Sequence, residues 1–327
     1  MLRAYQNDAA KLVQIPAPRS VPPASLVWLD LLEPTPQEKA EVESLLGLVI
    51  PTRAEMEEIE LSARLYNEDG AEFMTMTALT GLDTEEPAKT AITFILKGTT
   101  LITVRYADPK PFLAFLMRTQ KPKSVACSNG SQIFLGLLEA IIDRSADALE
   151  RLGNEIDQIS RDVFRKKSKS AKQTQHDLRF IIEQIGAKAE LLTMVQESLV
   201  SISRLVAFHS APNDSTSKAS RDARQLVKLI QRDALSLGEH ARALSTKLNF
   251  LLDATLGLIN LEQNQIIKIF SVAAVVLLPP TLVGSIYGMN FDIMPELHWD
   301  FGYPFSLGLM VLSSILPFWY FKRRGWL

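Results

Sequence analysis

Two long uncharged runs near the C-terminus constrain the fold of this chain more than any other feature of its sequence. The first covers the 23 residues 269–291, and the second covers the 21 residues 301–321. A helix of about 20 apolar residues crosses the roughly 30 Å hydrocarbon core of a bilayer. Too little chain follows the second run to bury the remaining faces of two such helices in a soluble fold. We therefore predict an integral membrane protein with two transmembrane helices, at 269–291 and 301–321.

The charges around these runs predict their orientation. Lys268 precedes the first run and a basic tail, 322–327, follows the second, whereas the connecting loop 292–300 has no lysine or arginine. Because positive charge favours the cytoplasmic side, we expect both termini in the cytoplasm and the loop outside. The N-terminal residues lack the apolar segment of a signal peptide, so the chain before the first run should stay on the cytoplasmic side. These features predict a multi-pass membrane protein.

Residues 1–127 predict a cytoplasmic α/β domain. Residues 26–30 have the composition of a β-strand. Strand-like segments on both sides of a polar turn predict a β-hairpin, because the turn reverses the chain direction. Two such pairs are present: 63–66 with 71–80, and 90–96 with 99–106. A sheet assembled from these hairpins is mostly antiparallel or mixed.

Residues 128–268 predict a long helical stalk on the cytoplasmic side. Apolar residues recur every three or four positions over 128–165, 175–208 and about 220–287. No strong break separates the last segment from the first membrane run, so one helix of about 68 residues, roughly 100 Å long, would join the stalk to the membrane. Capping boxes predict two shorter helices in the α/β domain, at Thr35 with Glu38 and at Thr52 with Glu55.

A tripeptide at the end of the first membrane run identifies a family. Residues 288–290 read Gly-Met-Asn, and residues 294–297 in the following loop read Met-Pro-Glu-Leu. In this context the sequence resembles the CorA family of magnesium and cobalt transporters, whose hallmark is Gly-Met-Asn at the outer end of the first of two C-terminal membrane helices. The similarity is greatest to the bacterial branch. It extends over further short segments: 279–281, 301–304 and 320–327.

The resemblance implies a homopentamer with a cytoplasmic funnel, in which each subunit has an α/β cytoplasmic domain, long stalk helices and a two-helix transmembrane hairpin. Five copies of the first membrane helix would line a pore, and five copies of the second would surround them. The implied activity is uptake of Mg²⁺, with Co²⁺ and Ni²⁺ as further ions, driven by the membrane potential and gated by cytoplasmic Mg²⁺. The implied partners are other copies of the chain, the lipid bilayer and divalent cations.

The Gly-Met-Asn corner has the chemistry of a filter for hydrated ions. Magnesium holds its six waters tightly, and the run 269–291 contains no carboxylate that would strip them. The amide oxygen of Asn290 can hydrogen-bond the hydration shell without trapping the ion, while Gly288 permits close approach of the backbone. We therefore assign Gly288, Met289 and Asn290 to a selectivity filter. From spacing alone, Asn290 is equally well explained as a helix C-cap.

One face of the long helix is suited to line a pore. Steps of three and four residues back from Asn290 select small or polar side chains, interrupted by three apolar ones. The residues of this face are Asp253, Leu256, Asn260, Asn264, Ile267, Ser271, Ala274, Leu278 and Thr281. We predict secondary hydrated-ion sites at Asn264 and Thr281 and dewetting rings at Ile267 and Leu278. The resemblance places Asp253, Asn264 and Asn290 at positions that the family uses in conduction.

Carboxylates in the outer loop and in the cytoplasmic part of the chain are candidates for binding cations. Asp292, Glu296 and Asp300 would concentrate divalent cations at the outer mouth of an oligomer, although they are equally explained as solvated interface residues. The resemblance implies regulatory Mg²⁺ sites that bridge neighbouring subunits when cytoplasmic Mg²⁺ is high. The candidate ligands are Asp83, Asp233 and Glu239, each of which is also explained as an ordinary solvated charge.

Composition excludes several other classes of function. The net charge of −2 lacks the basic excess of a nucleic-acid binder, and a single cysteine with four scattered histidines does not predict a zinc enzyme. No catalytic constellation or phosphate loop is present, so we predict a protein that is not an enzyme and needs no organic cofactor. Two alternatives remain: a zinc-transporting member of the same superfamily, and a membrane-tethered enzyme or scaffold.

Overall fold

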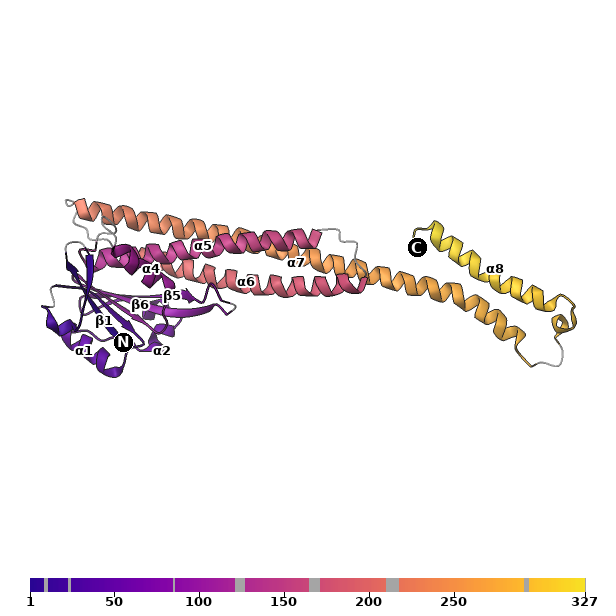
Figure 1. The fold of residues 1–327 in the computed structure, drawn as a ribbon, viewed down its shortest axis with the longest axis horizontal. Helices are drawn as coiled ribbons and strands as arrows, with labels where there is room; N and C mark the ends of the chain where they lie inside the picture. Colours follow the sequence, from indigo (N-terminus) through magenta and orange to yellow (C-terminus); the bar gives the residue numbers. More distant parts are fainter. Residues whose placement is uncertain are drawn as a thin grey trace. The chain divides into compact units, whose positions relative to one another are not determined.

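The computed structural model of the chain describes residues 1–8, 11–22, 25–84, 86–120, 127–164, 171–209, 218–290 and 294–326 (Figure 1). Contacts divide the chain into two units, which are considered separately. The first unit comprises residues 1–165 and 183–251, and the second comprises residues 166–182 and 252–327. The first unit thus combines the sheet with most of the long helices, and the second contains the C-terminal part of the longest helix.

The first unit is built on a mixed sheet with the strand order β2-β1-β3-β7-β6-β5-β4. The strands are β1 (Leu2–Asp8), β2 (Lys11–Ile15), β3 (Leu26–Leu32), β4 (Leu65–Glu68), β5 (Ala71–Thr80), β6 (Ala88–Lys97) and β7 (Thr100–Arg105). Only the central pair β3–β7 is parallel among these neighbours, and the others are antiparallel. The predicted hairpins are confirmed as β4–β5 and β6–β7, and the sheet is mixed as expected.

The sequence analysis did not predict β1 and β2, which extend the sheet beyond β3. Of the seven residues of β1, only Ala4 and Tyr5 are buried, so the strand lacks a clear alternation of apolar and polar residues. Its conformation depends on pairing with β3 on one side and β2 on the other. The Tyr5 ring also stacks on the buried Trp28 of β3, with 4.8 Å between ring centroids. These are tertiary contacts, and local sequence does not report them.

The helices confirm the predicted pattern, with ends that differ by a few residues. They are α1 (Pro36–Leu46), α2 (Arg53–Glu57), α3 (Leu61–Arg64), α4 (Lys110–Thr119), α5 (Gly130–Phe164), α6 (Ala171–Phe208), α7 (Lys218–Tyr287) and α8 (Gly302–Arg323), with 3₁₀ turns η1 (Pro18–Ser20) and η3 (Pro295–His298). Both capping boxes are present at Thr35 and Thr52. Helix α4 was not predicted. Helix α7 is continuous through Pro279 and Pro280, from the predicted stalk to the Gly-Met-Asn corner.

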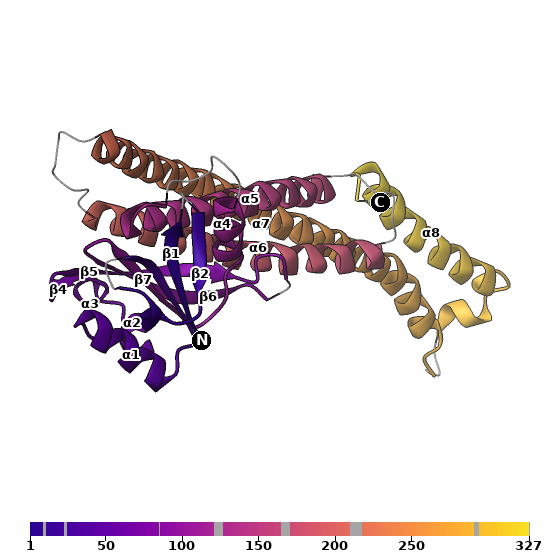
Figure 2. The ribbon, with the colours of Figure 1, turned by 60° about the vertical axis from the view of Figure 1, so that its left-hand side comes forward.

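Helices cover both faces of the sheet in the first unit (Figure 2). On one face, α4 and α5 bury an apolar cluster that includes Trp28, Phe94 and Phe134, and α6 and α7 pack against the same cluster. On the other face, α1 and α2 bury a second cluster around Val42, Met56 and Phe73. The sheet is therefore the middle layer of three, and the long helices α5, α6 and α7 form the outer layer on one side.

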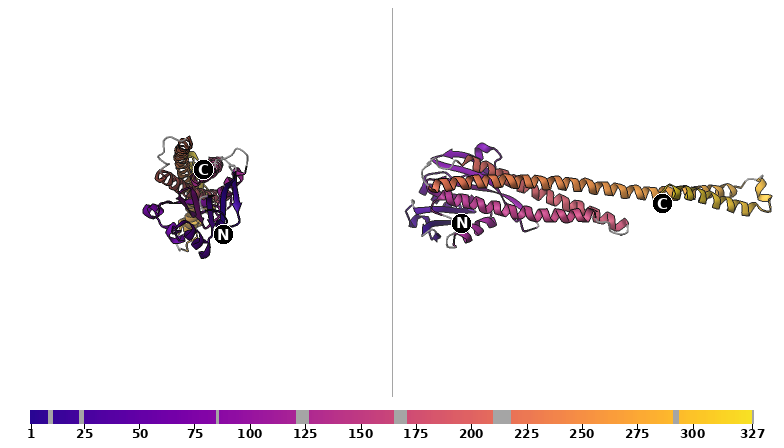
Figure 3. Two further views of the ribbon diagram at one scale, coloured as in Figure 1. Left: turned by 90° about the vertical axis from the view of Figure 1, so that its left-hand side faces the viewer. Right: turned by 90° about the horizontal axis from the view of Figure 1, so that it is seen from above.

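Helix α5 begins in close contact with the sheet. A Cβ atom on Gly130, its first residue, would lie only 2.3 Å from the Leu101 nitrogen of β7. Glycine is required there because any side chain would separate the helix from the strand. Further along, ion pairs join α5 to its neighbours: Lys188 of α6 lies 2.6 Å from Glu155, and Lys247 of α7 pairs with Asp157. Figure 3 shows these helices side by side.

A buried ion pair joins the two parallel strands. The Arg105 guanidinium of β7 donates to both carboxylate oxygens of Asp30 on β3, at 2.9 and 2.8 Å, and both side chains are 1% exposed. Thr103 donates a further hydrogen bond to Asp30 at 2.8 Å. Burial alone would lower the pKa of Arg105. The hydrogen bonds that Arg105 donates to Asp30, together with the negative charge of Asp30, raise this pKa above its ordinary value. The pair is fully compensated, which its burial requires.

The carboxylate of Glu38 should stabilise the domain in a pH-dependent way. Burial opposes its ionisation, but hydrogen bonds from the Thr35 and Leu2 nitrogens and the Met1 ammonium lower its pKa from 4.5 to about 2. A depressed pKa contributes stability that is present above pH 4.5 and is lost as the pH falls towards 2. Glu38→Gln should therefore destabilise the folded protein at pH 7 by on the order of 1–3 kcal/mol.

Thermal unfolding of the full-length protein in detergent would measure this effect. The difference in Tm between parent and Glu38→Gln should shrink as the pH is lowered from 4.5 to 2. Glu41→Gln on the same helix is the control. Among the described residues, the Glu41 carboxylate has only a long 3.9 Å contact to Arg19, so this replacement should change Tm little at any pH. A Glu38→Gln difference that stays constant across this range would contradict the assignment.

Within the described residues, three helical segments are long and apolar enough to cross a membrane: Leu178–Phe208, Arg221–Tyr287 and Gly302–Arg323. The sequence analysis predicted spans within the second and third. In the first segment, 39% of the most apolar window is buried inside the structure, against 6% in each of the others. Its side chains Leu192, Val195 and Leu199 are buried, so its apolar residues already pack within the protein. The most apolar windows of the other two segments leave most of their side chains uncovered.

Candidate functional site

The Gly-Met-Asn corner lies immediately after helix α7, which ends at Tyr287. The Gly288 nitrogen donates to the Gly284 carbonyl at 3.0 Å, and the Met289 nitrogen donates to the Ile286 carbonyl at 3.2 Å, so the corner closes the last helical turn. A Cβ atom on Gly288 would lie 3.1 Å from the Gly284 oxygen. A larger residue would therefore need a small shift of the last helical turn.

Asn290 is the last described residue before the loop, and its side chain is exposed. A helix-capping asparagine usually adopts a left-handed conformation. Among the described non-glycine residues, a positive φ occurs only at Glu33 and Asp69, so Asn290 does not have this geometry. Its amide also makes no hydrogen bond to any residue in the described part of the chain. The geometry gives the C-cap explanation no support, and the role of Asn290 in a filter stays a prediction.

Every side chain of the predicted pore face is exposed in the single chain. The nine residues lie along α7 in the second unit: Asp253, Leu256, Asn260, Asn264, Ile267, Ser271, Ala274, Leu278 and Thr281. The Thr281 hydroxyl donates to the Leu277 carbonyl at 2.8 Å, so its oxygen can still accept a hydrogen bond. The two residues predicted to form apolar rings in an oligomer are among the most exposed, with Ile267 at 61% and Leu278 at 64%. Their assignment to a pore remains a prediction.

Other faces of the same helix segment carry large exposed apolar side chains. The most exposed are Leu261, Phe270, Leu277 and Leu282. Soluble monomers rarely leave so large a contiguous apolar surface in water. Helix α8 covers part of α7 at a glycine, where the Met310 Cε lies 3.3 Å from the position of a Gly284 Cβ. The remaining apolar surface requires lipid or further copies of the chain.

The outer acidic residues are only partly described. Asp292 lies outside the described residues, as does the side chain of Glu296, and Asp300 is exposed. At the opposite end of α8, the guanidinium of Arg323 lies over the Trp319 ring, 5.5 Å from its centroid, and Arg324 lies 5.3 Å from that of Tyr320. Basic and aromatic side chains together are typical of a membrane interface.

Asp83, a predicted regulatory ligand, is surrounded by cations in this structure. It follows β5 and forms ion pairs with Lys110 at 2.5 Å and with Arg144 and Arg151. Hydrogen bonds from Lys110 and Arg151, with the further contribution of Arg144, hold its pKa well below the usual range. These three cations compete with any metal ion for the carboxylate. The geometry thus favours a structural role in joining the β5–β6 loop to α4 and α5.

The other two regulatory candidates are differently placed. Asp233 is half-buried and Glu239 is exposed, and both lie on α7. Neither forms an ion pair with another residue that the structure describes. The single chain does not bring three His, Cys, Asp or Glu side chains together as a metal cluster within its described residues. A ligand set shared between subunits is not tested by one chain, so these assignments stay predictions.

The sequence analysis did not single out Glu262, whose Oε2 is buried without a hydrogen-bond partner among the described residues. It lies two residues before Asn264, about 200° around the helix, and so points away from the predicted pore face. The signal was available in the sequence, since Glu262 is the only charged residue between Asp253 and Lys268.

Comparison with known proteins identifies the family. Residues 23–323 match the model of the CorA-like Mg²⁺ transporter protein family. The chain is 36% identical over 329 residues to the magnesium transport protein CorA of Pasteurella multocida (strain Pm70), and 35% identical over 327 residues to that of Escherichia coli (strain K12). In both cases 100% of each chain is covered.

The fold agrees with this result. The solved structure of the complete CorA magnesium transporter from Methanocaldococcus jannaschii matches 100% of this chain and 99% of its own, with a TM-score of 0.80 at 19% identity. At that identity the match establishes the fold alone. The family follows from the sequence matches, which cover the α/β domain, the long helices and the Gly-Met-Asn corner. The chain therefore belongs to the CorA-like Mg²⁺ transporter family.

Proposed function

We propose that several copies of this chain form a channel that carries Mg²⁺ into the cell, with Co²⁺ and Ni²⁺ as further ions. The observation that carries the proposal is the exposed amide of Asn290, which bonds no described residue and lies at the end of a long, uncharged helix segment. The curated relatives that match over their full length are named magnesium transport proteins. Together these observations support an ion path along α7 that ends at residues 288–290.

The channel requires an oligomer, and we propose a homopentamer. One pair of helices, α7 and α8, cannot enclose a water-filled path. In a ring, the polar face of α7 would turn inwards, while α8 would form a hairpin with α7 and lie outside it. This arrangement would cover the apolar side chains that the single chain leaves exposed, such as Phe270 and Leu277. The acidic loop would lie outside the inner membrane and both termini in the cytoplasm, as the flanking charges favour.

The proposed mechanism recognises the ion with its waters attached. Removing waters from Mg²⁺ would need several carboxylates, and the segment between Lys268 and Asp292 has none. A ring of Asn290 amide oxygens would accept hydrogen bonds from the hydration shell, and Asn264 and Thr281 would do so again further in. A divalent ion that moves inwards through 100 mV gains about 4.6 kcal/mol, so no other energy source is needed.

We also propose that cytoplasmic Mg²⁺ closes the channel. The closed state would hold the Ile267 and Leu278 rings narrow enough to exclude water. Magnesium bound between the stalk carboxylates of neighbouring subunits would stabilise this state by neutralising their repulsion. Asp233 and Glu239 are the better candidate ligands because, unlike Asp83, they have no competing cation among the described residues.

Purified protein in liposomes tests the proposed function. With an inside-negative potential imposed, external Mg²⁺ should enter at a rate that rises with the potential, as read by a trapped magnesium-sensitive dye. Magnesium trapped inside should slow entry, and Asp233→Asn with Glu239→Gln should remove this inhibition, whereas Asp83→Asn should retain it. Uptake of radioactive zinc without magnesium uptake would favour the zinc-transporting alternative. Entry that is independent of the potential would contradict the channel.

A further inference from the structure

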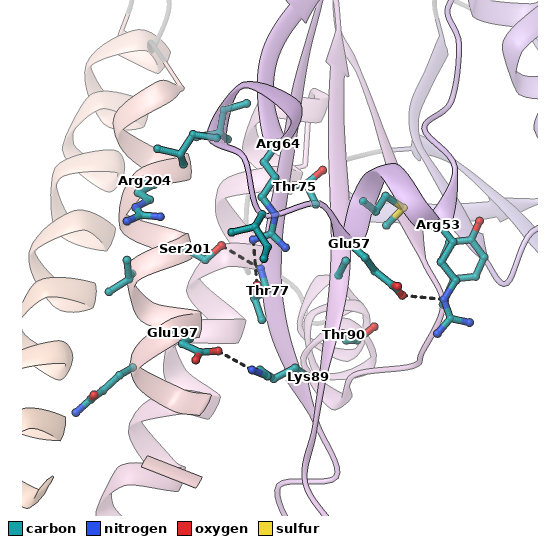
Figure 4. Close-up of a pocket in the computed structure, with 18 of the residues that line it drawn as sticks. Arg53, Glu57, Arg64, Thr75, Thr77, Lys89, Thr90, Glu197, Ser201 and Arg204 are labelled. Atoms are coloured by element: carbon teal, nitrogen blue, oxygen red, sulfur yellow. Dashed lines mark hydrogen bonds and ion pairs between the residues drawn. The ribbon is translucent and has the colours of Figure 1, made fainter. Parts of the chain in front are cut away.

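A pocket of about 770 Å³ lies in the first unit, between the sheet and helix α6 (Figure 4). Its walls come from α2, α3, the strands β4 to β6, and the α6 segment that contains Glu197 and Arg204. A cavity of this size falls within the range of small-molecule sites in proteins. The pocket is distant in sequence from the predicted pore face, and the proposed function does not use it.

The charges in this pocket are unbalanced. Four basic side chains line it, and two of them have carboxylate partners: Lys89 lies 2.8 Å from Glu197, and Arg53 lies 2.9 Å from Glu57. The other two, Arg64 and Arg204, form no ion pair with any residue that the structure describes. The pocket therefore carries an excess of two positive charges, both on guanidinium groups.

Arg64 also has an unsatisfied donor. Its Nη1 donates to the Thr77 hydroxyl at 3.2 Å, but its Nε is buried and has no hydrogen-bond partner among the described residues. Buried donors without partners are costly, and charged ones more so. Figure 4 shows Arg64 beside the strands, held by Thr77, with Arg204 across from it on α6. Because the protein covers the Nε, an acceptor in the pocket would contact the outer nitrogens of the Arg64 guanidinium instead of this atom.

The two guanidinium groups destabilise one another. Burial, with a further contribution from the charge of Arg204, lowers the pKa of Arg64 below its ordinary value. Two like charges on a half-enclosed surface repel, and a bound anion would convert this repulsion into attraction. Arginine is well suited to such binding, because its planar fork of donors matches the oxygens of phosphate.

The remaining lining indicates more than a bare anion. The residues Thr75, Thr90 and Thr193 line the pocket together with the apolar residues Met56 and Val200. A phosphate group alone would occupy a small part of about 770 Å³. We infer that this pocket binds a phosphate-bearing small molecule, with its phosphate oxygens between Arg64 and Arg204 and its remaining part against the apolar wall.

Calorimetric titration of the full-length protein in detergent tests this inference. The probes are inorganic phosphate and ATP, each with EDTA so that no magnesium complex forms, at constant ionic strength because general screening would mimic weak binding. We expect saturable binding of at least one probe. Tighter binding of ATP would identify an organic phosphate as the ligand, and equal affinity would identify phosphate itself.

Variants separate this pocket from other basic surfaces. Arg64→Gln and Arg204→Gln should each weaken binding by about tenfold or more, the loss expected for one charge-assisted contact. Arg204 is exposed, so its replacement should leave the fold intact even if Arg64→Gln does not. Arg179→Gln, an exposed arginine of the same helix outside the pocket, is the matched control and should bind like the parent. Absence of saturable binding, or equal affinity in Arg204→Gln and the parent, would overturn the inference; neither result bears on magnesium uptake.

Discussion

Replacing Asn290 by alanine should reduce the rate of magnesium entry into liposomes by at least about tenfold, the effect expected from losing one strong hydrogen bond to a charged species. The variant removes the amide oxygen that we propose for contact with the hydration shell, and it does so in every subunit of the ring at once. The described residues offer Asn290 no hydrogen-bond partner, so its loss should not disturb the helix end. The effect should therefore be on transport and not on folding.

A matched control is available on the same helix. Gln265 is an exposed amide of α7 that lies about 100° around the helix from Asn264, outside the predicted pore face. Gln265→Ala should transport magnesium at the parental rate, and both variants should elute as the parental oligomer in gel filtration. Equal uptake by Asn290→Ala and the parent would remove the Gly-Met-Asn corner from the ion path and, with it, the proposed mechanism.

Replacing Arg105 by leucine should destabilise the α/β domain by about 3–5 kcal/mol. The change leaves the Asp30 carboxylate buried, with Thr103 as its remaining close donor and Arg3 4.0 Å away. Leaving one buried charge without its partner destabilises the fold by more than the intact pair stabilised it, because the desolvation cost of the remaining charge is no longer compensated. The double variant Arg105→Leu with Asp30→Leu should recover most of the loss, since no charge remains in the core.

Thermal unfolding of these variants measures the coupling. Arg53→Leu is the matched control: Arg53 forms an ion pair with Glu57 at a similar distance, 2.9 Å, but the two side chains are 65% and 58% exposed. It should cost less than about 1 kcal/mol. If Arg105→Leu were as mild as Arg53→Leu, or if the double variant were no better than the single one, the pair would not stabilise the core in the way its burial indicates.

The helices and hairpins were predictable because their signals are local. Thr35 and Glu38 are three residues apart, and the capping box that they form requires nothing from the rest of the fold. The β4–β5 hairpin likewise joins segments that meet at one turn. By contrast, β1 is a strand only because β3 and β2 pair with it. Its own residues carry too little alternation to specify the conformation.

The candidate sites likewise include one that the sequence reveals and one that depends on the fold. The motif at residues 288–290 stands out in the sequence because it interrupts an apolar run at the predicted membrane boundary. The role of Asp83 cannot be read from the sequence, because Arg144 and Arg151 are more than sixty positions away along the chain. Sequence alone presents Asp83 as a free carboxylate, whereas the fold surrounds it with three cations.

The sequence by itself determined the two apolar membrane segments, the long helix that leads to them and the Gly-Met-Asn corner, since each depends on composition or spacing within a continuous stretch. Only the tertiary structure decided which charges are paired. The Asp30–Arg105 pair joins residues 75 positions apart, and Arg64 and Arg204 face one pocket from opposite walls. The physical reason is that the energy of a charge depends on its burial and on its neighbours, and folding brings these together from distant parts of the chain.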